Sequence, residues 1–241
     1  MTIRACLWAL SFVIFGSLQG CGNGNEIESA VPSSAEGWLE KSAQDQGIGA
    51  FEEAILALDQ ALILKPGWDE AHFRKAKVYQ EWSKNREAMR SFKQALEISP
   101  GHVEALSGLA VVLSALKLNE EAIEAYKRIA RIQPENASIH FKIALENWYI
   151  QNLPETVEHY KKAIEIDPEY LQAHLNLASV YEKMENWQEA IREVEIATQL
   201  AQQKGDMREV AIAKKKLPFL IAREHLTKEE LALKSHPSFN K

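Results

Sequence analysis

Cysteine is scarce in this sequence, and so are apolar runs long enough to cross a membrane. Among 241 residues only Cys6 and Cys21 are cysteines. Cys6 lies in the apolar stretch Ala5 to Leu18, which is typical of a cleavable secretory signal, so the mature chain would keep one thiol and form no internal disulfide. That stretch of about fourteen residues is shorter than the roughly 20 that a membrane-crossing helix needs, which disfavours a permanent transmembrane anchor.

Catalytic signatures are missing as well. The sequence contains no G-x-S-x-G, no H-E-x-x-H, no phosphate-binding glycine loop and no C-x-x-C pair. Its formal net charge of −6 would be repelled by nucleic acid and by anionic lipid. The short basic run Lys214 to Lys216 is interpreted as a solvated helix face. We therefore expect no enzyme, no cofactor, no nucleic-acid partner and no small-molecule substrate.

The chain does contain an internal repeat. Segments close with Pro66, Pro100, Pro134 and Pro168 at constant intervals of 34 residues, a period typical of helix–turn–helix solenoids. Small residues recur 24 positions before each proline or its equivalent, at Ser42, Ala76, Ala110, Ala144 and Ala178. Larger residues recur eight positions before it, at Leu58, Phe92, Tyr126, Tyr160 and Val194. A core stripe at helical spacing supports the same phase, as in Leu106, Leu109, Ala110 and Leu113.

This pattern resembles the tetratricopeptide repeat (TPR) over residues 35–204. The resemblance implies an all-α solenoid of about five helix–turn–helix repeats, at 35–68, 69–102, 103–136, 137–170 and 171–204. The second helix of each unit is expected to begin near Glu52, Glu87, Glu120, Glu155 and Gln188. Residues 205–241 are predicted to form C-terminal capping helices that start at Asp206 and Thr227, with Pro218 breaking or kinking the segment between them.

Three histidines, His72, His140 and His174, occupy the same place in their units. Such residues would lie on successive helices about 10 Å apart, whereas zinc ligands lie about 2.1 Å from their metal. We therefore expect these histidines to pack between units, and we expect no metal site.

The N-terminus carries a second resemblance. Leu18-Gln19-Gly20-Cys21 is similar to the lipobox of bacterial lipoproteins, although Gln19 is bulkier than the usual residue. The resemblance implies a signal peptide at 1–20, lipid modification of Cys21, and a flexible tether over 21–34. Gly22, where retention signals carry aspartate, implies the outer membrane, facing the periplasm of a bacterial cell envelope. The alternative is an ordinary signal peptide with an incidental cysteine.

A second stripe on the first helices should line the concave groove that TPR proteins use for binding. It comprises Phe73, Lys77, Gln80, Ser107, Val111, Ser114, Phe141, Leu145, Trp148, Leu175, Ser179 and Glu182, with Tyr149 beside it. An apolar and aromatic stripe on an open surface indicates a site for a partner helix or extended peptide. The alternative is that the chain's own tether or C-terminal helices fill the groove. Some TPR proteins bind the terminal carboxylate of a peptide with a clamp of Lys and Asn side chains. The corresponding positions here hold the apolar residues Phe73, Val111, Phe141 and Leu145.

These features predict a lipid-anchored, non-enzymatic scaffold or assembly factor in the bacterial envelope that binds a protein partner. Similar lipoproteins act as pilotins or as members of envelope-assembly machines, and the residues do not choose among these roles. An accessory subunit of an envelope enzyme complex, such as a cell-wall hydrolase or transferase, is the alternative.

Overall fold

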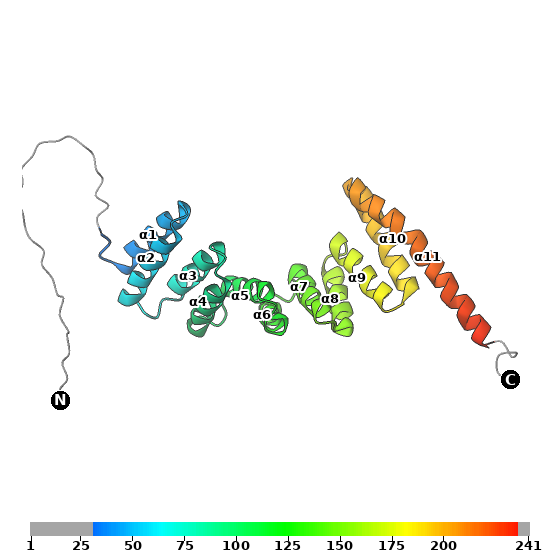
Figure 1. Cartoon of the computed structure of the whole chain (residues 1–241), viewed down its shortest axis with the longest axis horizontal. Coiled ribbons are helices and arrows are strands. Elements are labelled where there is room, and N and C mark those ends of the chain that lie inside the picture. The colour runs from blue at the N-terminus through cyan, green and yellow to red at the C-terminus, as the bar shows by residue number, and fades with distance from the viewer. Residues whose placement is uncertain (1–30, 236–241) are drawn as a thin grey trace, which may run out of the picture. The chain divides into compact units, whose positions relative to one another are not determined.

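The computed structural model describes residues 31–235, and all the regular secondary structure in this range is helical (Figure 1). The all-α prediction is therefore confirmed. Cys21 and the predicted signal peptide lie outside the described residues. The helices are α1 (Ala35–Gly47), α2 (Phe51–Leu64), α3 (Asp69–Glu81), α4 (Asn85–Ile98), α5 (Val103–Ala115), α6 (Asn119–Ile132), α7 (Ala137–Tyr149), α8 (Leu153–Ile166), α9 (Leu171–Lys183), α10 (Trp187–Lys204) and α11 (Met207–Ser235).

The first ten helices form five helical hairpins. Each odd-numbered helix packs against the helix that follows it, and each hairpin packs against the next one along the chain. The second helices begin at Phe51, Asn85, Asn119, Leu153 and Trp187, within two residues of the expected starts. Pro154 lies in the first turn of α8, where the missing backbone N–H leaves no intrahelical bond unmade.

The turn inside every hairpin uses one residue in the left-handed region. In the first hairpin that residue is Gly49, with φ of 77°. In the other four it is Ser83, Lys117, Gln151 and Glu185, with φ between 59° and 61°. These five positions follow the same spacing as the closing prolines, so the repeat extends to the backbone conformation of single residues.

Small residues stand where two helices approach closely, as predicted. Ala76, Ala110, Ala144 and Ala178 have no exposed surface. The larger residues predicted to fill the space between helices are also buried, with Phe92 and Tyr160 at 0% and 1% exposure. Gly108 belongs to this packing, because a Cβ added there would lie 2.3 Å from Cζ of Phe92. The ring of α4 therefore lies directly on the backbone of α5.

The recurring histidines connect successive units, which confirms their predicted packing role. The Nε2 atoms of His72, His140 and His174 lie 3.3, 3.2 and 3.1 Å from the carbonyl oxygens of Pro66, Pro134 and Pro168. Because a carbonyl only accepts, each Nε2 carries the hydrogen. Each histidine thus joins its own first helix to the closing loop of the preceding unit.

The bond from His140 to the Pro134 carbonyl also determines how His140 contacts the buried His159. Nδ1 of His140 carries no hydrogen when the ring is neutral, so it accepts from Nδ1 of His159 at 3.1 Å. Burial, with a smaller contribution from the neighbouring His140, lowers the pKa of His159 to about 4. Among the described residues no group of three or more ligating side chains could hold a metal ion.

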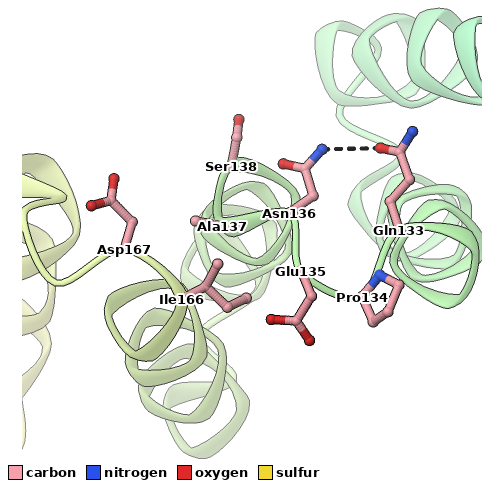
Figure 2. Close-up of a pocket in the computed structure, with 8 residues that line it drawn as sticks. All are labelled: Gln133, Pro134, Glu135, Asn136, Ala137, Ser138, Ile166 and Asp167. Atoms are coloured by element: carbon pink, nitrogen blue, oxygen red, sulfur yellow. Dashed lines mark hydrogen bonds between the residues drawn. The ribbon is translucent and has the colours of Figure 1, made fainter.

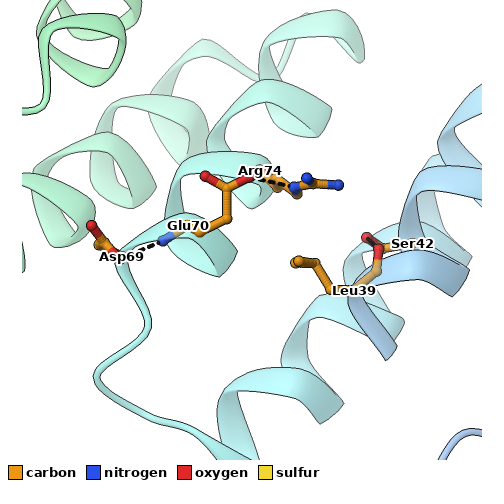
Figure 3. Close-up of polar contacts among 5 residues, drawn as sticks. All are labelled: Leu39, Ser42, Asp69, Glu70 and Arg74. Carbon is orange, nitrogen blue, oxygen red and sulfur yellow. Dashed lines mark hydrogen bonds and ion pairs between the residues drawn. The ribbon is translucent and has the colours of Figure 1, made fainter. Parts of the chain in front are cut away.

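Hydrogen bonds and an ion pair connect residues within each of the first two units (Figure 3). The Ser42 hydroxyl donates to the Leu39 carbonyl at 2.7 Å, and the guanidinium of Arg74 contacts Glu70 at 2.6 Å. Asp69, at the start of α3, accepts from the backbone N–H of Glu70 at 2.9 Å. It also accepts from the Ser99 hydroxyl, and this bond lowers the pKa of Asp69. The start of α3 is therefore joined to the end of α4.

The C-terminal segment differs from its prediction in one respect. Asp206 caps a helix as expected, since its carboxylate accepts from the N–H of Glu209 at 3.2 Å. The helix start predicted at Thr227 is wrong, because α11 runs unbroken from Met207 to Ser235 with Pro218 inside it. Packing explains this result: Val210, Ala213 and Leu220 are buried at 2%, 1% and 0% exposure and form one face of a single helix. Contact of that face with α10 outweighs the hydrogen bond that proline removes.

Candidate functional site

A half-open hollow lies on α7, α8 and α9. Its lining is Leu145, Trp148, Tyr149, Tyr160, Asn176 and Ser179, and its volume is about 250 Å³. Four of these residues, Leu145, Trp148, Tyr149 and Ser179, belong to the groove stripe predicted from the sequence. The structure thus brings together members of the stripe from two different units.

The apolar wall of the hollow comes from one helix. Leu145, Trp148 and Tyr149 stand three and four residues apart on α7, so they share one side of it. Leu145 and Trp148 are half-buried, whereas Tyr149 is 57% exposed. Tyr149 is therefore the large side chain of this wall with the most surface left for a partner to cover.

The opposite wall is polar. The Asn176 amide on α9 donates to the Tyr160 hydroxyl on α8 at 3.1 Å. Burial raises the pKa of Tyr160 to about 12, so its phenol stays protonated at neutral pH and remains a hydrogen-bond donor. The Ser179 hydroxyl donates to the Leu175 carbonyl at 3.0 Å. Because Tyr160 is buried and the Ser179 hydroxyl already has partners, the half-buried Asn176 amide is the main polar group that this wall offers to a partner.

Two lysines lie at the edge of the hollow. The Lys183 ammonium is 4.9 Å from the centre of the Trp148 ring and also donates to the Gln151 side chain. Lys216, from α11, lies 3.0 Å from the Ser179 hydroxyl and 2.8 Å from the Glu182 carboxylate. The C-terminal helix therefore reaches the predicted groove on α9 through the side chain of Lys216.

The remaining predicted groove residues do not line the hollow. Phe73 packs on His102 and Phe92, with ring centres 4.8 and 6.1 Å apart. Phe141 stacks on Tyr170 at 5.0 Å and tilts against Tyr160 at 5.5 Å. Both rings are half-buried and support the core. Exposed members of the stripe are Lys77 and Val111, and half-buried ones are Gln80, Ser107, Ser114, Leu175 and Glu182.

Sequence reasoning missed three contributors to this site. Tyr160 received only a packing role, and no periodic signal distinguishes Asn176 from other polar residues on α9. Lys216 was interpreted as part of a solvated basic run, yet it forms the ion pair with Glu182. Only the position of α11 against α10 brings Lys216 to α9.

A second, wider hollow of about 560 Å³ lies where two units join (Figure 2). Its lining is the loop and first turn at 133–138 together with Ile166 and Asp167 from the end of α8. Figure 2 shows the Asn136 amide donating to the Gln133 side chain, at 3.0 Å. This hollow contains no aromatic residue and no member of the predicted stripe, so it is the weaker candidate for a partner's anchor residue.

Comparison with known proteins supports the assignment of the helical hairpins to a known repeat family. Models described as tetratricopeptide repeat match residues 83–144 and 173–208, and a model described as TPR repeat matches residues 150–185. No curated protein matches the chain. Among the described residues, no helix is both long and apolar enough to span a bilayer.

Several solved structures share this architecture. The crystal structure of MamA protein is 21% identical with a TM-score of 0.66, over 71% of this chain and 94% of that one. MamA from Desulfovibrio magneticus RS-1, residues 41 to the end, is 19% identical with a TM-score of 0.63, over 73% and 98%. YrrB, described as a TPR protein with an unusual peptide-binding site, is 21% identical with a TM-score of 0.64, over 76% and 92%. At these identities the likeness concerns the fold alone.

Proposed function

Because this chain is a tetratricopeptide repeat protein, we propose that it is a non-enzymatic interaction scaffold that binds a partner peptide or helix in the hollow of α7, α8 and α9. The observation that carries the proposal is the meeting of an apolar wall, on which Tyr149 is 57% exposed, with a polar wall in one half-open hollow. YrrB, a structural neighbour described as a TPR protein with an unusual peptide-binding site, supports the same kind of use. TPR scaffolds are generally non-enzymatic, which supports binding rather than catalysis.

The two walls suit the two parts of a peptide. Trp148 and Tyr149 offer aromatic surface to an apolar side chain, and such rings are the residue types that carry most interface energy. The half-buried Asn176 side chain offers an amide donor and a carbonyl acceptor to peptide backbone groups, whose burial is costly unless they are hydrogen-bonded. The hollow therefore suits a segment with one large apolar residue next to exposed backbone.

A random peptide library displayed on phage and panned against the chain tests this proposal. The enriched peptides are expected to bind Tyr149→Ala and Asn176→Ala at least about twentyfold more weakly than the parent chain. The helical circular-dichroism signal of Tyr149→Ala should be unchanged, since 57% of this side chain is exposed. Leu56→Ala is the matched control, because Leu56 is 63% exposed on α2 and far from the hollow in the sequence.

Either of two results would overturn the proposed site. The first is a panning experiment that enriches no peptide. The second is a set of enriched peptides whose affinity is the same for Tyr149→Ala, Asn176→Ala and the parent chain.

We further propose that a lipid on Cys21 holds the scaffold at the outer membrane of a bacterial envelope, on the periplasmic side. The lipobox-like residues Leu18 to Cys21 and the following Gly22 support this localisation. The formal net charge of −6 also supports it, because an acidic chain gains no electrostatic attraction from anionic lipid and needs another means of attachment. The scaffold would then act as an assembly or docking factor for envelope proteins.

A further inference from the structure

The outer side of the last helix carries a regular row of exposed apolar residues. Ile212, Phe219 and Leu226 of α11 are 46%, 47% and 52% exposed. They stand seven residues apart, so they lie nearly above one another along the helix. The residues that pack against α10 belong to a different side of the helix, on which Val210 and Leu220 are buried. We name this row the α11 stripe.

A helix that only caps a solenoid does not need such a stripe. Terminal repeats keep these arrays soluble by presenting a polar outer face, and an exposed apolar row does the opposite. Ile212 to Leu226 spans two heptads, or about 21 Å along the axis. A row of one large residue per heptad is narrower than the two-position seam of a coiled coil, so it suits contact with a single partner helix, whereas a helix that lies in a membrane surface presents a broader apolar face.

Charged groups beside the stripe indicate which helix would fit. Arg208 and Lys215 are exposed, and helical spacing places them within about 40° of the stripe. The Arg223 guanidinium lies 5.4 Å from the centre of the Phe219 ring. Over residues 207–226 the two acidic residues lie off the stripe: helical spacing places Glu209 about 80° and Glu224 about 140° from Phe219, and Glu224 accepts from Lys228 at 2.6 Å. The surroundings of the stripe are therefore basic.

Basic surroundings argue against pairing between two copies of this helix. In an antiparallel pair centred on Phe219, Lys215 of one copy would face Arg223 of the other, and like charges across an interface oppose association. Acidic side chains on a partner would instead meet Arg208 and Lys215. Charge complementarity thus favours a partner of opposite charge.

We propose that the α11 stripe is a second docking surface, which binds an amphipathic helix of a partner protein whose apolar seam is flanked by Asp or Glu. The partner helix spans at least the two heptads between Ile212 and Leu226. This surface is separate from the hollow of α7, α8 and α9, so the chain would hold two partners, or two parts of one partner, at the same time.

The test uses two synthetic probe peptides and the whole chain. Both peptides have three heptads with leucine at the seam positions; one carries glutamate and the other lysine at the flanking positions. Fluorescence anisotropy should show saturable binding of the glutamate peptide, weakened by added salt, and much weaker binding of the lysine peptide. Phe219→Glu should weaken binding of the glutamate peptide by about twentyfold or more.

The controls separate this surface from folding and from the first site. Phe219→Glu should melt at the same temperature as the parent chain, because the ring is 47% exposed. Leu56→Glu places the same charge on another exposed apolar position, 63% exposed on α2, and should bind the glutamate peptide normally. Tyr149→Ala should bind it normally as well.

Other outcomes would overturn the proposal. No binding of the glutamate peptide, or equal binding of both peptides, would exclude the acidic helix. Binding to phosphatidylglycerol vesicles that depends on Phe219, without binding of the glutamate peptide, would make the stripe a membrane contact. A dimer in sedimentation velocity that Phe219→Glu dissociates, again without peptide binding, would assign the stripe to a second copy of this chain.

Discussion

Glu146 of α7 is a carboxylic acid inside the helical array. It is 3% exposed, and its Oε2 atom has no hydrogen-bond partner. The Ser114 hydroxyl donates to the carboxylate and lowers its pKa, but burial is the larger effect and raises the pKa of Glu146 above the usual value. Ser114, which the sequence placed in the groove stripe, therefore uses its hydroxyl to satisfy part of a buried group.

Replacing Glu146 by Gln should stabilise the chain at neutral pH by on the order of 1 kcal/mol, because the buried negative charge is removed while the shape is kept. The raised pKa means that the folded state holds this proton more tightly than the unfolded state. The charged carboxylate therefore costs stability above the folded pKa, and this cost disappears as the pH falls below the unfolded pKa. Urea unfolding at several pH values should show the gain shrinking towards acid pH.

Glu124→Gln provides the comparison at this scale. The Glu124 side chain is 66% exposed and lies 3.6 Å from Lys127, so its removal should change stability by no more than about 0.5 kcal/mol. An equal gain from Glu146→Gln and Glu124→Gln at pH 7 would mean that burial of Glu146 has no energetic consequence.

At the scale of the helix and its turn, the first hairpin has the same backbone conformation as the other hairpins although its sequence is irregular. Gly47 and Gly49 stand close together, a spacing found in no other unit. The structure shows that Gly49 takes the left-handed position that Ser83, Lys117, Gln151 and Glu185 take in their own units. The first unit therefore keeps the common turn and differs only in using the residue type that adopts it without strain.

The two glycines make a matched pair of substitutions. A Cβ added to either one would meet no atom within 4 Å, so packing does not distinguish them. Gly49→Ala should lower the free energy of unfolding by about 1 kcal/mol, because φ is 77°. Gly47→Ala, at the last residue of α1, should be neutral or stabilising by up to about 1 kcal/mol. Thermal melting followed by circular dichroism measures both, and identical midpoints would refute the assigned turn.

Element boundaries were predictable where a residue acts locally. The starts of the second helices followed from the acidic residues and Pro154, since their effects depend on their own turn. The continuity of α11 was not predicted, because proline and the cap-like sequence at Thr227 are local signals for ending a helix. Contact with α10 through Val210, Ala213 and Leu220 outweighs them, and that contact is non-local.

For the whole molecule, the outstanding prediction is how the chain reaches its place of action. Cys21→Ser should remove lipid modification, so the variant should leave the detergent phase in Triton X-114 partitioning and lack the mass of a diacylglyceryl group. The expected change is nearly complete, because Cys21 is the sole acceptor in the proposal and stable anchoring depends on the acyl chains that it would carry. Identical partitioning and identical mature mass for variant and parent would exclude the lipid anchor.

The sequence by itself determined the class, the period and most of the buried positions of this protein. These properties repeat along the chain, so the same pattern can be recognised independently in each unit. Spacing alone was therefore enough to place Ala110 and Phe92 in the core. The tertiary structure decided which groove residues meet. Phe141 became part of the core because Tyr160 and Tyr170 of other helices pack around it, while Leu145, Trp148 and Tyr149 were left at an open hollow. Asn176 and Lys216 joined that site only through packing between α8, α9 and α11, and contacts between residues 16 and 37 positions apart have no signature in a local pattern.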